Sequence, residues 1–407
     1  MSDFRQLRVG DHISLLSGFP FSSDYFDQQE GTRLIRIRDL LDSEGETYYR
    51  GVFDSKWLVR HRDILIGMDG DFNIARWKGS EALLNQRILK ADARSNGLIE
   101  QDFFFYWFGP LLLQIHNRTA ATTVKHLSIK DVENAKGLFP NKAAQRRIAE
   151  ILSTLDEAIE QTEALIAKHQ RIKSGLMHDL FTRGVTPDGH LRPTREQAPD
   201  LYKESPLGWI PKEWEISQLG EVAEVNRGKF TIRPRNDLRF YGGQYPFIQT
   251  GDVSLANGRV LSTFSQTLNQ SGLAVSRLFD EGTIMVTIAA NIADTCVLGL
   301  PMCAPDSLVG VLPNKGQVSR FLQLCISRRK SWLEARAPQT AQKNINLEDL
   351  RPLLIPSPCQ HEQEAIAAIY ECVDFSLAES EQMVGKLRQQ KYGLMHDLLT
   401  GRMRVNV

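Results

Sequence analysis

Two stretches of the chain, residues 145–180 and 363–398, carry apolar positions at the spacing of a long α-helix that packs on another helix. Charged residues fill many of the remaining positions, and neither stretch contains a proline. With Ile148 as the first core position, a 3.5-residue repeat predicts one seam in each stretch. The first seam comprises Ile148, Ile151, Leu155, Ala158, Thr162, Leu165, His169, Ile172 and Leu176; the second comprises Ile366, Ile369, Val373, Ser376, Ser380, Met383, Leu387, Gln390 and Leu394.

The two stretches are copies of one another. The sequence Gly-Leu-Met-His-Asp-Leu begins at Gly175 and again at Gly393, 218 positions later, and the same offset places Gln145 on Gln363 without a gap. This period is too long for a solenoid, so the chain is predicted to hold two copies of one unit. A helix from residue 145 to residue 180 would be ~54 Å long, too long to bury its seam in its own domain. We therefore expect the two helices to pair antiparallel, with a pseudo-two-fold axis between the halves.

The repeat continues, more weakly, into the segment that precedes each helix. Glycine turns occur at residues 17–19 and 227–229, and apolar runs of strand character at 63–66 and 283–286 are each followed by a polar loop. A third pair of segments, 122–127 and 342–347, comes shortly before the helices. The frame recurs while the loops differ, as expected if two domains do the same work on different targets.

These patterns predict an α+β protein: two pseudo-symmetric mixed α/β domains separated by two long antiparallel helices that form a coiled coil. The stretch from Thr182 to Pro206 is rich in proline, glycine and charge, which is typical of a linker. The predicted segments are a first domain at 1–140, a central helix at 141–182, the linker at 183–206, a second domain at 207–358, a C-terminal helix at 359–400 and a tail at 401–407.

Composition narrows the class without deciding the function. Lys plus Arg and Asp plus Glu are both 49, so net charge argues neither for nor against a nucleic-acid partner. The five cysteines contain no CxxC pair, which makes a disulfide framework or a zinc site improbable and favours a cytoplasmic location. For the same reason we expect no bound metal. We also expect no membrane association, because no apolar run approaches 18 residues and the N-terminus is no signal peptide.

Motifs of catalysis are missing from the sequence. It has no GxGxxG, GxxxxGK[ST], HExxH or GxSxG pattern, and no Asn/Asp-Pro-Pro-aromatic tetrad of amino-methyltransferases. The repeated His178 and His396 could suggest acid–base chemistry. Both lie at a predicted helix end, however, so packing or an interaction with the helix dipole is the better interpretation. The sequence therefore predicts a protein without catalytic residues.

Local clusters of basic residues are the positive signal for a partner. Such a cluster is often only a solvated surface, but clusters in loops of both repeated domains are better explained by contacts to DNA phosphates. One cluster comprises Arg227, Lys229, Arg233, Arg235 and Arg239; a second comprises Arg328, Arg329, Lys330, Arg336 and Lys343 around Trp332; a third comprises Arg87, Lys90 and Arg94.

Several motifs together resemble the specificity (S) subunits of type I restriction-modification systems along nearly the whole chain. They are residues 17–23 (SGFPFSS), 63–66 with the loop that follows, 145–152 (QRRIAEIL), 173–180, and 207–214 (LGWIPKEW) combined with the paired GLMHDL helices. One departure lies at the helix entry, where the family commonly has Pro-Glu-Gln and this chain has Ala-Ala-Gln145 and His-Glu-Gln363. The departure concerns only the entry of the helices, and the first helix is predicted to begin at residue 141.

The resemblance implies a non-catalytic DNA-recognition subunit. Each target-recognition domain would read one half of a bipartite, asymmetric site in double-stranded DNA, and the helices would set the spacing. The helices would also dock two methyltransferase subunits, and two restriction/translocase subunits could join. No cofactor is expected in this chain, because S-adenosylmethionine, ATP and Mg²⁺ would be bound by those partners. The coiled-coil and docking positions would be Ile148, Ile151, Leu155, Leu165, Ile172, Leu176, Ile366, Ile369, Val373, Met383, Leu387 and Leu394.

The candidate DNA contacts are the polar and basic residues of the paired loops. Arg or Lys would pair with guanine and Asn or Gln with adenine. Turns that merely close hairpins remain an alternative for these loops. Two other functions also stay open, a protein-binding adaptor with a helical spacer and an orphan DNA-binding regulator. The candidates are Asp69, Asp71, Asn73, Arg87, Lys125, Arg227, Lys229, Arg233, Arg235, Asn291, Arg329, Lys343 and Asn344.

Overall fold

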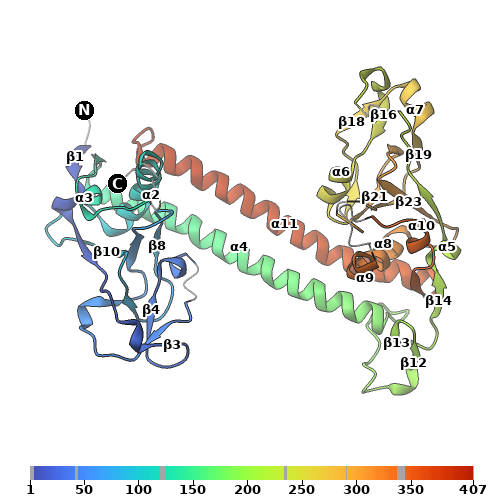
Figure 1. Cartoon of the computed structure of the whole chain (residues 1–407), viewed down its shortest axis with the longest axis horizontal. Helices are drawn as coiled ribbons and strands as arrows, with labels where there is room; N and C mark the ends of the chain where they lie inside the picture. Colours follow the sequence, from blue (N-terminus) through green and yellow to red (C-terminus); the bar gives the residue numbers. More distant parts are fainter. Residues whose placement is uncertain are drawn as a thin grey trace. The chain divides into compact units, whose positions relative to one another are not determined.

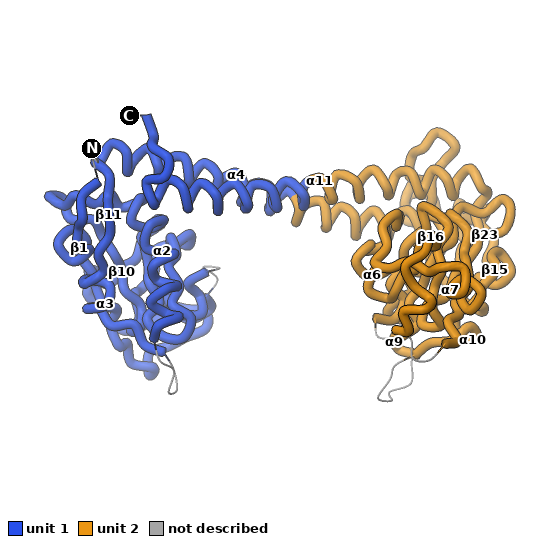
Figure 2. The backbone as a smooth tube through the Cα atoms, turned by 90° about the horizontal axis from the view of Figure 1, so that it is seen from above, with its two compact units in different colours: residues 1–165, 380–407 blue, residues 166–379 orange. Residues whose placement is uncertain are grey.

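The computed structural model describes residues 4–41, 45–119, 125–232, 236–289, 291–336 and 344–406. The chain forms two compact units (Figure 2): unit 1 contains residues 1–165 and 380–407, and unit 2 contains residues 166–379. Two long helices, α4 (Lys142–Thr182) and α11 (Gln360–Leu399), contribute to both units. Each unit therefore combines a globular part with the beginning of one long helix and the end of the other.

The globular part of unit 1 is built on three sheets (Figure 1). The central one is antiparallel, and its middle strand Ile64–Gly67 is fully buried. In spatial order the sheets are β2 (Ile13–Ser17), β10 (Ile88–Ala93), β7 (Ile64–Gly67), β8 (Ile74–Arg76); β3 (Phe26–Asp27), β5 (Tyr48–Tyr49), β4 (Thr32–Ile35), β9 (Ala82–Leu84), β6 (Leu58–Val59); and β1 (Arg5–Arg8), β11 (Lys136–Phe139). The helices are α1 (Val9–His12), α2 (Gln101–Arg118) and α3 (Ile129–Glu133), with short 3₁₀ turns η1 (Ser23–Tyr25), η2 (Ile37–Asp39) and η3 (Ser55–Trp57).

Unit 2 repeats this plan with different loops. Its sheets, in spatial order, are β15 (Ala223–Arg227), β23 (Leu308–Pro313), β20 (Ile284–Thr287), β21 (Thr295–Leu298), β17 (Val260–Leu261); β18 (Gln266–Leu268), β16 (Tyr241–Phe247), β22 (Met302–Ala304), β19 (Arg277–Phe279); and β14 (Glu215–Gln218), β24 (Leu354–Ser357). The helices are α5 (Leu219–Val222), α6 (Thr250–Ala256), α7 (Gln270–Val275), α8 (Ser319–Arg328), α9 (Lys330–Arg336) and α10 (Leu347–Leu350), with the 3₁₀ turn η5 (Leu238–Phe240).

The two central sheets have the same strand order, β2-β10-β7-β8 in unit 1 and β15-β23-β20-β21 in unit 2. The apolar runs recognised in the sequence are the equivalent strands β7 and β20, and both are buried along their whole length. A strand covered on both faces needs a continuous apolar run rather than an alternating one. The predicted α+β fold with two repeated domains is confirmed.

The paired glycine turns also occupy equivalent places. Gly18 donates its backbone N–H to the carbonyl of Ile88, and Gly228 donates to the carbonyl of Leu308. A Cβ atom on Gly18 would lie 1.9 Å from a backbone oxygen of the neighbouring strand connection, and one on Gly228 would lie 2.1 Å from the corresponding oxygen. Only glycine permits this close approach of two backbone segments, which explains why both copies keep it.

In both units a segment of α4 lies beside a segment of α11, and the helices run antiparallel (Figure 1). The seam differs from the predicted one at alternate positions. Leu165, Ile172 and Met383, predicted to be in the seam, are 41%, 44% and 51% exposed. The buried or half-buried positions follow the heptad Ile148, Leu152, Leu155, Ile159, Thr162, Ile166, His169, Lys173, Leu176 and Leu180 in α4, and Ile366, Tyr370, Val373, Leu377, Ser380, Val384, Leu387, Lys391, Leu394 and Leu398 in α11.

The difference between the predicted and the observed seam positions has a physical cause. A heptad can be stepped as three residues then four, or as four then three, and the sequence offers apolar side chains for both choices at most positions. The second choice places Lys173 and Lys391 in the seam, and the predicted phase avoided them. In the structure each lysine is neutralised by an aspartate of the other helix: the Nζ–carboxylate distance is 2.5 Å for Lys173 with Asp374 and for Lys391 with Asp156.

The repeated Gly-Leu-Met-His-Asp-Leu motif lies where each helix ends against a globular core. Leu180 and Phe181 belong to the main core of unit 2, whereas Leu398 belongs to the main core of unit 1. His178 and His396 are exposed, and the backbone carbonyl of each accepts a hydrogen bond from a threonine four residues later. The motif thus anchors each helix end through its leucines, while the exposed histidine side chains do not pack against either core.

The predicted linker is structured. Residues 183–214 include the 3₁₀ turn η4 (Pro199–Leu201) and a hairpin of β12 (Tyr202–Ser205) and β13 (Gly208–Pro211). Glu362, 7% exposed, holds the segment against α11. Its carboxylate pairs with the guanidinium of Arg192 and accepts a hydrogen bond from the indole N–H of Trp214 at 3.0 Å. The segment is therefore part of unit 2 rather than an extended spacer.

Candidate functional site

One end of each central sheet gathers the polar segments that the sequence paired. In unit 1 the turn that follows β2, the loop after β7 and the turn before β10 all leave the sheet at this end, because Ser17 pairs with Leu89 and Gly67 pairs with Ile88. In unit 2 Arg227 pairs with Val309, and Thr287 pairs with Leu308. Loops that are far apart in the sequence are thereby brought together on a rigid scaffold.

In unit 1 the loop of residues 68–73 is joined to residues 125–127 by a short stretch of strand pairing. Asp69 forms a β-bridge with His126, and their side chains approach to 2.6 Å between Oδ1 and Nδ1. Arg87 lies on the other side of Asp69, with its Nε 3.5 Å from Oδ2. Asp71 is the most exposed of the group, with 92% of its side chain accessible.

Two other predicted contacts in unit 1 have structural partners. Lys125 is half-buried, and its ammonium donates to the backbone carbonyl of His116 at 2.8 Å, in the last turn of α2. A lysine there satisfies a helix-terminal carbonyl and the negative end of the helix dipole. The backbone carbonyl of Asn73 accepts from Gly67 at 2.8 Å and closes the loop. Arg87 has a φ of +71°, a strained conformation for a residue other than glycine.

In unit 2 the loop of residues 288–294 is arranged in the same way. Ala289 forms a β-bridge with Asn344, whose side chain is exposed. Asn291 donates from Nδ2 to the hydroxyl of Ser254 at 3.3 Å, and that hydroxyl donates to Asp294 at 2.6 Å. The other oxygen of Asp294 pairs with Lys330 at 2.5 Å, which links the loop to α9.

The two loops share two backbone hydrogen bonds at equivalent positions. The N–H of Met68 donates to the carbonyl of Arg87, and that of Ile288 donates to the carbonyl of Ser307. The N–H of Leu127 donates to the carbonyl of Met68 at 2.7 Å, and that of Ile345 donates to the carbonyl of Ile288 at 3.0 Å. The sequence alignment that paired residues 122–127 with 342–347 is therefore wrong by two positions, because Leu127 corresponds to Ile345.

The side chains on this common frame differ between the units. Unit 1 carries Asp69, Arg87 and His126, where unit 2 carries Ala289, Ser307 and Asn344 at the equivalent backbone positions. Sequence reasoning missed His126 and Ser307. His126 lies next to the predicted Lys125, so a correct register of the repeat would have found it; Ser307 has no signal in the sequence alone.

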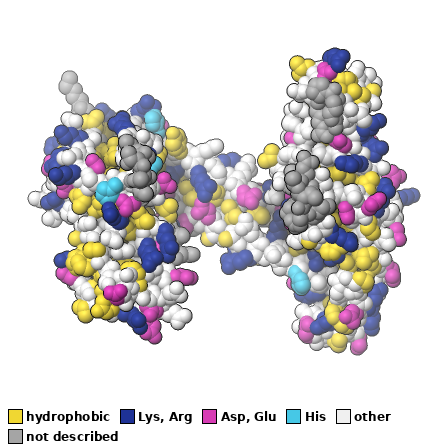
Figure 3. Space-filling view, in the orientation of Figure 1, with side chains coloured by type: hydrophobic (Ala, Val, Ile, Leu, Met, Phe, Trp, Pro, Cys, Tyr) yellow, Lys and Arg dark blue, Asp and Glu magenta, His cyan; other side chains and the backbone are white. Residues whose placement is uncertain are grey.

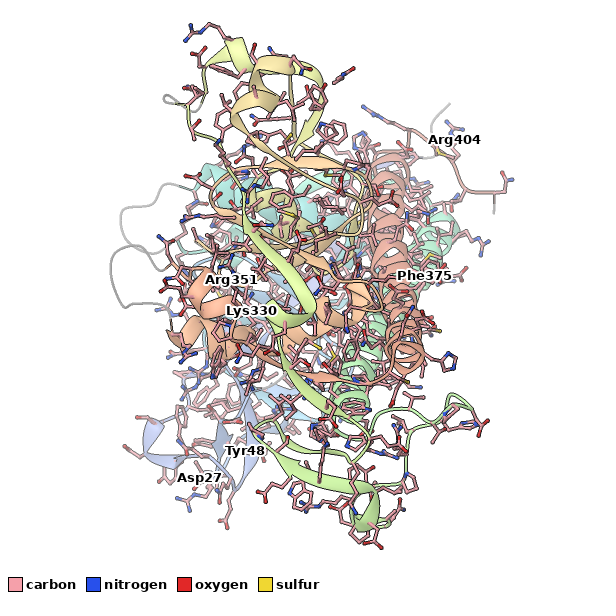
Figure 4. The ribbon with its side chains drawn as sticks, turned by 90° about the vertical axis from the view of Figure 1, so that its right-hand side faces the viewer. Asp27, Tyr48, Lys330, Arg351, Phe375 and Arg404 are labelled. Atoms are coloured by element: carbon pink, nitrogen blue, oxygen red, sulfur yellow. The ribbon has the colours of Figure 1, made fainter. Side chains whose placement is uncertain are left out.

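Two residues of the second basic cluster, Arg329 and Arg336, gather around Trp332 of α9, whereas the guanidinium carbon of Arg328 lies 4.6 Å from the ring centroid of Phe181. The guanidinium carbon of Arg329 lies 5.1 Å from the ring centroid of Trp332, and that of Arg336 lies 4.2 Å from it. Figure 4 shows Lys330 on the side of unit 2 away from Phe375 of α11. The α9 cluster and the loop it contacts thus lie on the face of unit 2 that is turned away from the exposed side of that helix.

Arg227 and Lys229 are exposed at the same end of the central sheet, at the close of β15. The Nε of Arg227 donates to the backbone carbonyl of Asp306 at 2.6 Å, beside Ser307. Of the remaining predicted contacts, Arg233, Arg235 and Lys343 lie outside the described residues. In Figure 3 Lys and Arg side chains are interspersed with Asp and Glu on the drawn face of each unit. Any electrostatic attraction to an anionic partner is therefore local.

The described residues hold no cluster of three or more His, Cys, Asp or Glu side chains suited to a metal ion. Across the same described ranges, every helix is too short or too polar to span a bilayer. The chemistry available at the two sheet ends is hydrogen bonding and charge pairing by Asp, Asn, Ser, Arg and His side chains. Such groups recognise a partner by its donors and acceptors.

Comparison with known proteins points to one family. A family model described as the type I restriction modification DNA specificity domain matches residues 1–168 and 211–382. The chain is 28% identical over 381 residues to the type I restriction enzyme EcoBI specificity subunit of Escherichia coli, which covers 90% of this chain and 78% of that protein. It is 24% identical over 416 residues to the MjaVIII specificity subunit of Methanocaldococcus jannaschii, which covers 99% and 93%.

The fold also matches a solved structure. The S subunit of a type I restriction-modification system from M. genitalium superposes with a TM-score of 0.68 at 14% identity, over 99% of this chain and 96% of that one. At this level of identity the match concerns the fold.

Proposed function

The chain belongs to the type I restriction-modification DNA specificity family, and we propose that it reads a bipartite, asymmetric site in double-stranded DNA, one half with each unit. The resemblance seen in the sequence is confirmed at the level of the family, and so is its assignment as a specificity subunit rather than an enzyme. The division of work between the units is the further step.

The observation that carries the proposal is the common frame with different side chains. Equivalent backbone hydrogen bonds hold the loop after β7 and the loop after β20, whereas Asp69 and His126 are replaced by Ala289 and Asn344. A structural turn needs its backbone bonds and little else, so a shared frame that carries different side chains in the two units favours direct readout of base edges. Two different sets of side chains imply two different half-sites.

The remaining parts of the complex follow from the family. We propose that α4 and α11 set the spacing of the half-sites and dock two methyltransferase subunits, and that two restriction/translocase subunits can join. The methyltransferases would bind S-adenosylmethionine, and the translocases would use ATP and Mg²⁺; this chain would bind none of them. We place the complex in the cytoplasm, where the DNA it acts on is found.

The test is co-expression of the chain with its methyltransferase partners, followed by sequencing of methylated adenines. We expect a motif of two defined halves around a fixed spacer of undefined bases. Replacing Asn291 and Asn344 by Ala should make one half degenerate and leave the other intact. Replacing Asp69 and His126 should do the reverse. Loss of both halves in either variant would refute the division between units.

Binding of the chain to DNA at several salt concentrations tests the other functions. We expect the logarithm of the binding constant to fall linearly with the logarithm of salt concentration, because basic side chains displace counterions from phosphates. Absence of DNA binding would favour a protein-binding adaptor. DNA binding by a chain that forms no complex with a methyltransferase when the two are co-expressed would favour an orphan regulator.

A further inference from the structure

Two lysine–aspartate pairs join the long helices in a repeated arrangement. In unit 2 Lys173 of α4 bonds to Asp374 of α11, and in unit 1 Lys391 of α11 bonds to Asp156 of α4, both with a distance of 2.5 Å between Nζ and Oδ1. The two lysines are equivalent in the repeat, and so are the two aspartates. The side chain of Asp374 is 8% exposed, and that of Lys173 is 23% exposed. The second pair is half-buried, with Lys391 27% and Asp156 32% exposed.

Each pair is also tied to the globular part of its own unit. In unit 2 the second oxygen of Asp374 lies 3.1 Å from Nε of Arg259, which follows α6, and 3.8 Å from the guanidinium of Arg320 on α8. In unit 1 the hydroxyl of Tyr106 on α2 donates to Asp156 at 2.6 Å. Each aspartate is thus the meeting point of three elements: both long helices and the globular part.

Charges buried at a seam are a poor means of gaining stability, because their desolvation offsets most of the attraction between them. Their best-attested effect is to select one arrangement over others, since any other arrangement leaves a buried charge without a partner. The apolar seam alone selects poorly between alternative arrangements of the helices. Its heptad is regular in both helices, so neighbouring apolar positions resemble each other chemically.

We propose that Asp374 with Lys173, and Asp156 with Lys391, are positioning residues that fix the orientation of each globular part on the paired helices. This rests on the proposed function, in which the helices set the distance between half-sites. The pairs would then decide how strictly the complex selects the number of base pairs between the half-sites. They would have no influence on which bases are read, because the loops at the sheet ends are untouched.

The chain offers a matched control. Arg388 of α11 pairs with Glu163 of α4 at 2.6 Å, but its side chain is 65% exposed and that of Glu163 is 44% exposed. Exposed pairs contribute little to stability or geometry. Glu163→Gln therefore removes an interhelical ion pair of the same kind without uncovering a buried charge.

The first experiment measures binding of the full chain with its methyltransferase partners to duplexes whose spacer is the preferred length, one base pair longer, or one shorter. We expect Asp374→Asn and Asp156→Asn each to reduce the discrimination between these spacers by about threefold or more. Lys173→Arg, which keeps the charge, and Glu163→Gln should keep the discrimination of the unaltered chain. Lys173→Met is the milder variant should Asp374→Asn not fold. Equal discrimination in all variants would overturn the proposal.

The second experiment needs no DNA. Spin labels at Leu255→Cys on α6, a site that is 86% exposed, and at Glu379→Cys on α11 report the distance between the globular part and the helix within unit 2. The exposed Cys359 and Cys372 are replaced by Ser beforehand. We expect a broader or shifted distance distribution in Asp374→Asn and an unchanged one in Glu163→Gln.

The outcomes separate the two ideas. A lower melting temperature for Asp374→Asn with an unchanged distance distribution and unchanged spacer preference would mean a merely structural role, and would overturn the positioning proposal. If the unaltered complex shows no dependence on two half-sites, the proposed function fails. The distance measurement would then still show whether the pair orients the globular part.

Discussion

Replacing Gln145 by Ala should destabilise unit 1 by about 2–4 kcal/mol and leave unit 2 unchanged. The side chain is 1% exposed at the start of α4 and makes three hydrogen bonds. Its Nε2 donates to the carbonyls of Leu98 and Pro140 at 2.9 and 2.8 Å, and its Oε1 accepts from the N–H of Glu100 at 2.9 Å. Truncation removes the partner of three backbone groups. The bond to the Pro140 carbonyl is buried and the other two are part-buried, so the cost of about 1–3 kcal/mol for an unsatisfied buried group applies in full only to the first.

Gln363 is the equivalent residue at the start of α11 in unit 2. It is 1% exposed, donates to the carbonyl of Pro358 at 3.0 Å and accepts from the N–H of Val318 at 3.0 Å. The family's helix-entry glutamine thus fastens the first turn of each long helix to its globular part. The measurement is chemical denaturation followed by amide hydrogen exchange, which assigns each loss of protection to a unit. Gln161→Ala, at an exposed position of α4, is the control and should change stability by no more than ~0.5 kcal/mol.

Two results would refute this account. One is a loss below about 1 kcal/mol for Gln145→Ala, which would mean that water or a shifted backbone replaces all three bonds. The other is an equal loss of protection in both units. That outcome would show that the units do not unfold separately, and that the helix entries are not local anchors.

Two further predictions concern the helices. Leu377→Ala should cost about 2–5 kcal/mol because Leu377 is 5% exposed in the seam, whereas Ile172→Ser should cost far less because Ile172 is 44% exposed; denaturation curves of the two variants check the corrected seam. Burial alone would raise the pKa of Asp374, but the hydrogen bonds from Lys173 and Arg259 outweigh it and lower that pKa below its usual range. The ion pairs of Asp374 therefore stabilise the fold at pH values above the ordinary pKa of Asp, and this stabilisation is lost as the pH falls through the lowered pKa of Asp374. Asp374→Asn should accordingly make the free energy of unfolding of unit 2 less dependent on pH on the acid side.

The fold could be predicted largely because the chain contains its own comparison. The recurrence of Gln145 as Gln363, and of the buried run at β7 as the run at β20, marks positions that the packing requires twice. The strand order and the corresponding backbone bonds follow from that repeat. The structured connection at residues 183–214 could not be predicted. It depends on the buried Glu362, whose partners lie about 150 to 180 positions earlier in the chain.

In the seam and at the candidate site, contacts between residues far apart in the sequence could not be predicted. A lysine in a seam is acceptable only when a specific carboxylate meets it, and nothing local to Lys173 reveals Asp374. Lys125 is predicted as a DNA contact because it lies in one of the paired polar segments; in the structure its ammonium donates to the last turn of α2, a contact that the sequence does not reveal. The segments that hold Asn291 and Asn344 do meet in the structure, through the bridge of Ala289 with Asn344, although the sequence pairing of the second segment is shifted by two positions.

The chemistry at the two sheet ends predicts how the half-sites differ. Unit 2 presents the amides of Asn291 and Asn344, and an amide pairs in bidentate fashion with N6 and N7 of adenine. Unit 1 presents Arg87, which would pair with guanine, and Asp69, which would accept from N4 of cytosine. We therefore expect A·T pairs in the half-site of unit 2 and G·C pairs in that of unit 1. Asn344→Ala should weaken DNA binding by ~1–3 kcal/mol and relax the preference at an adenine in the half-site of unit 2 only. Selection of binding sites from random duplexes, with each variant in complex with its methyltransferases, measures this directly. A relaxed position that is a G·C pair, or one in the half-site of unit 1, would contradict the assignment of the amide to adenine.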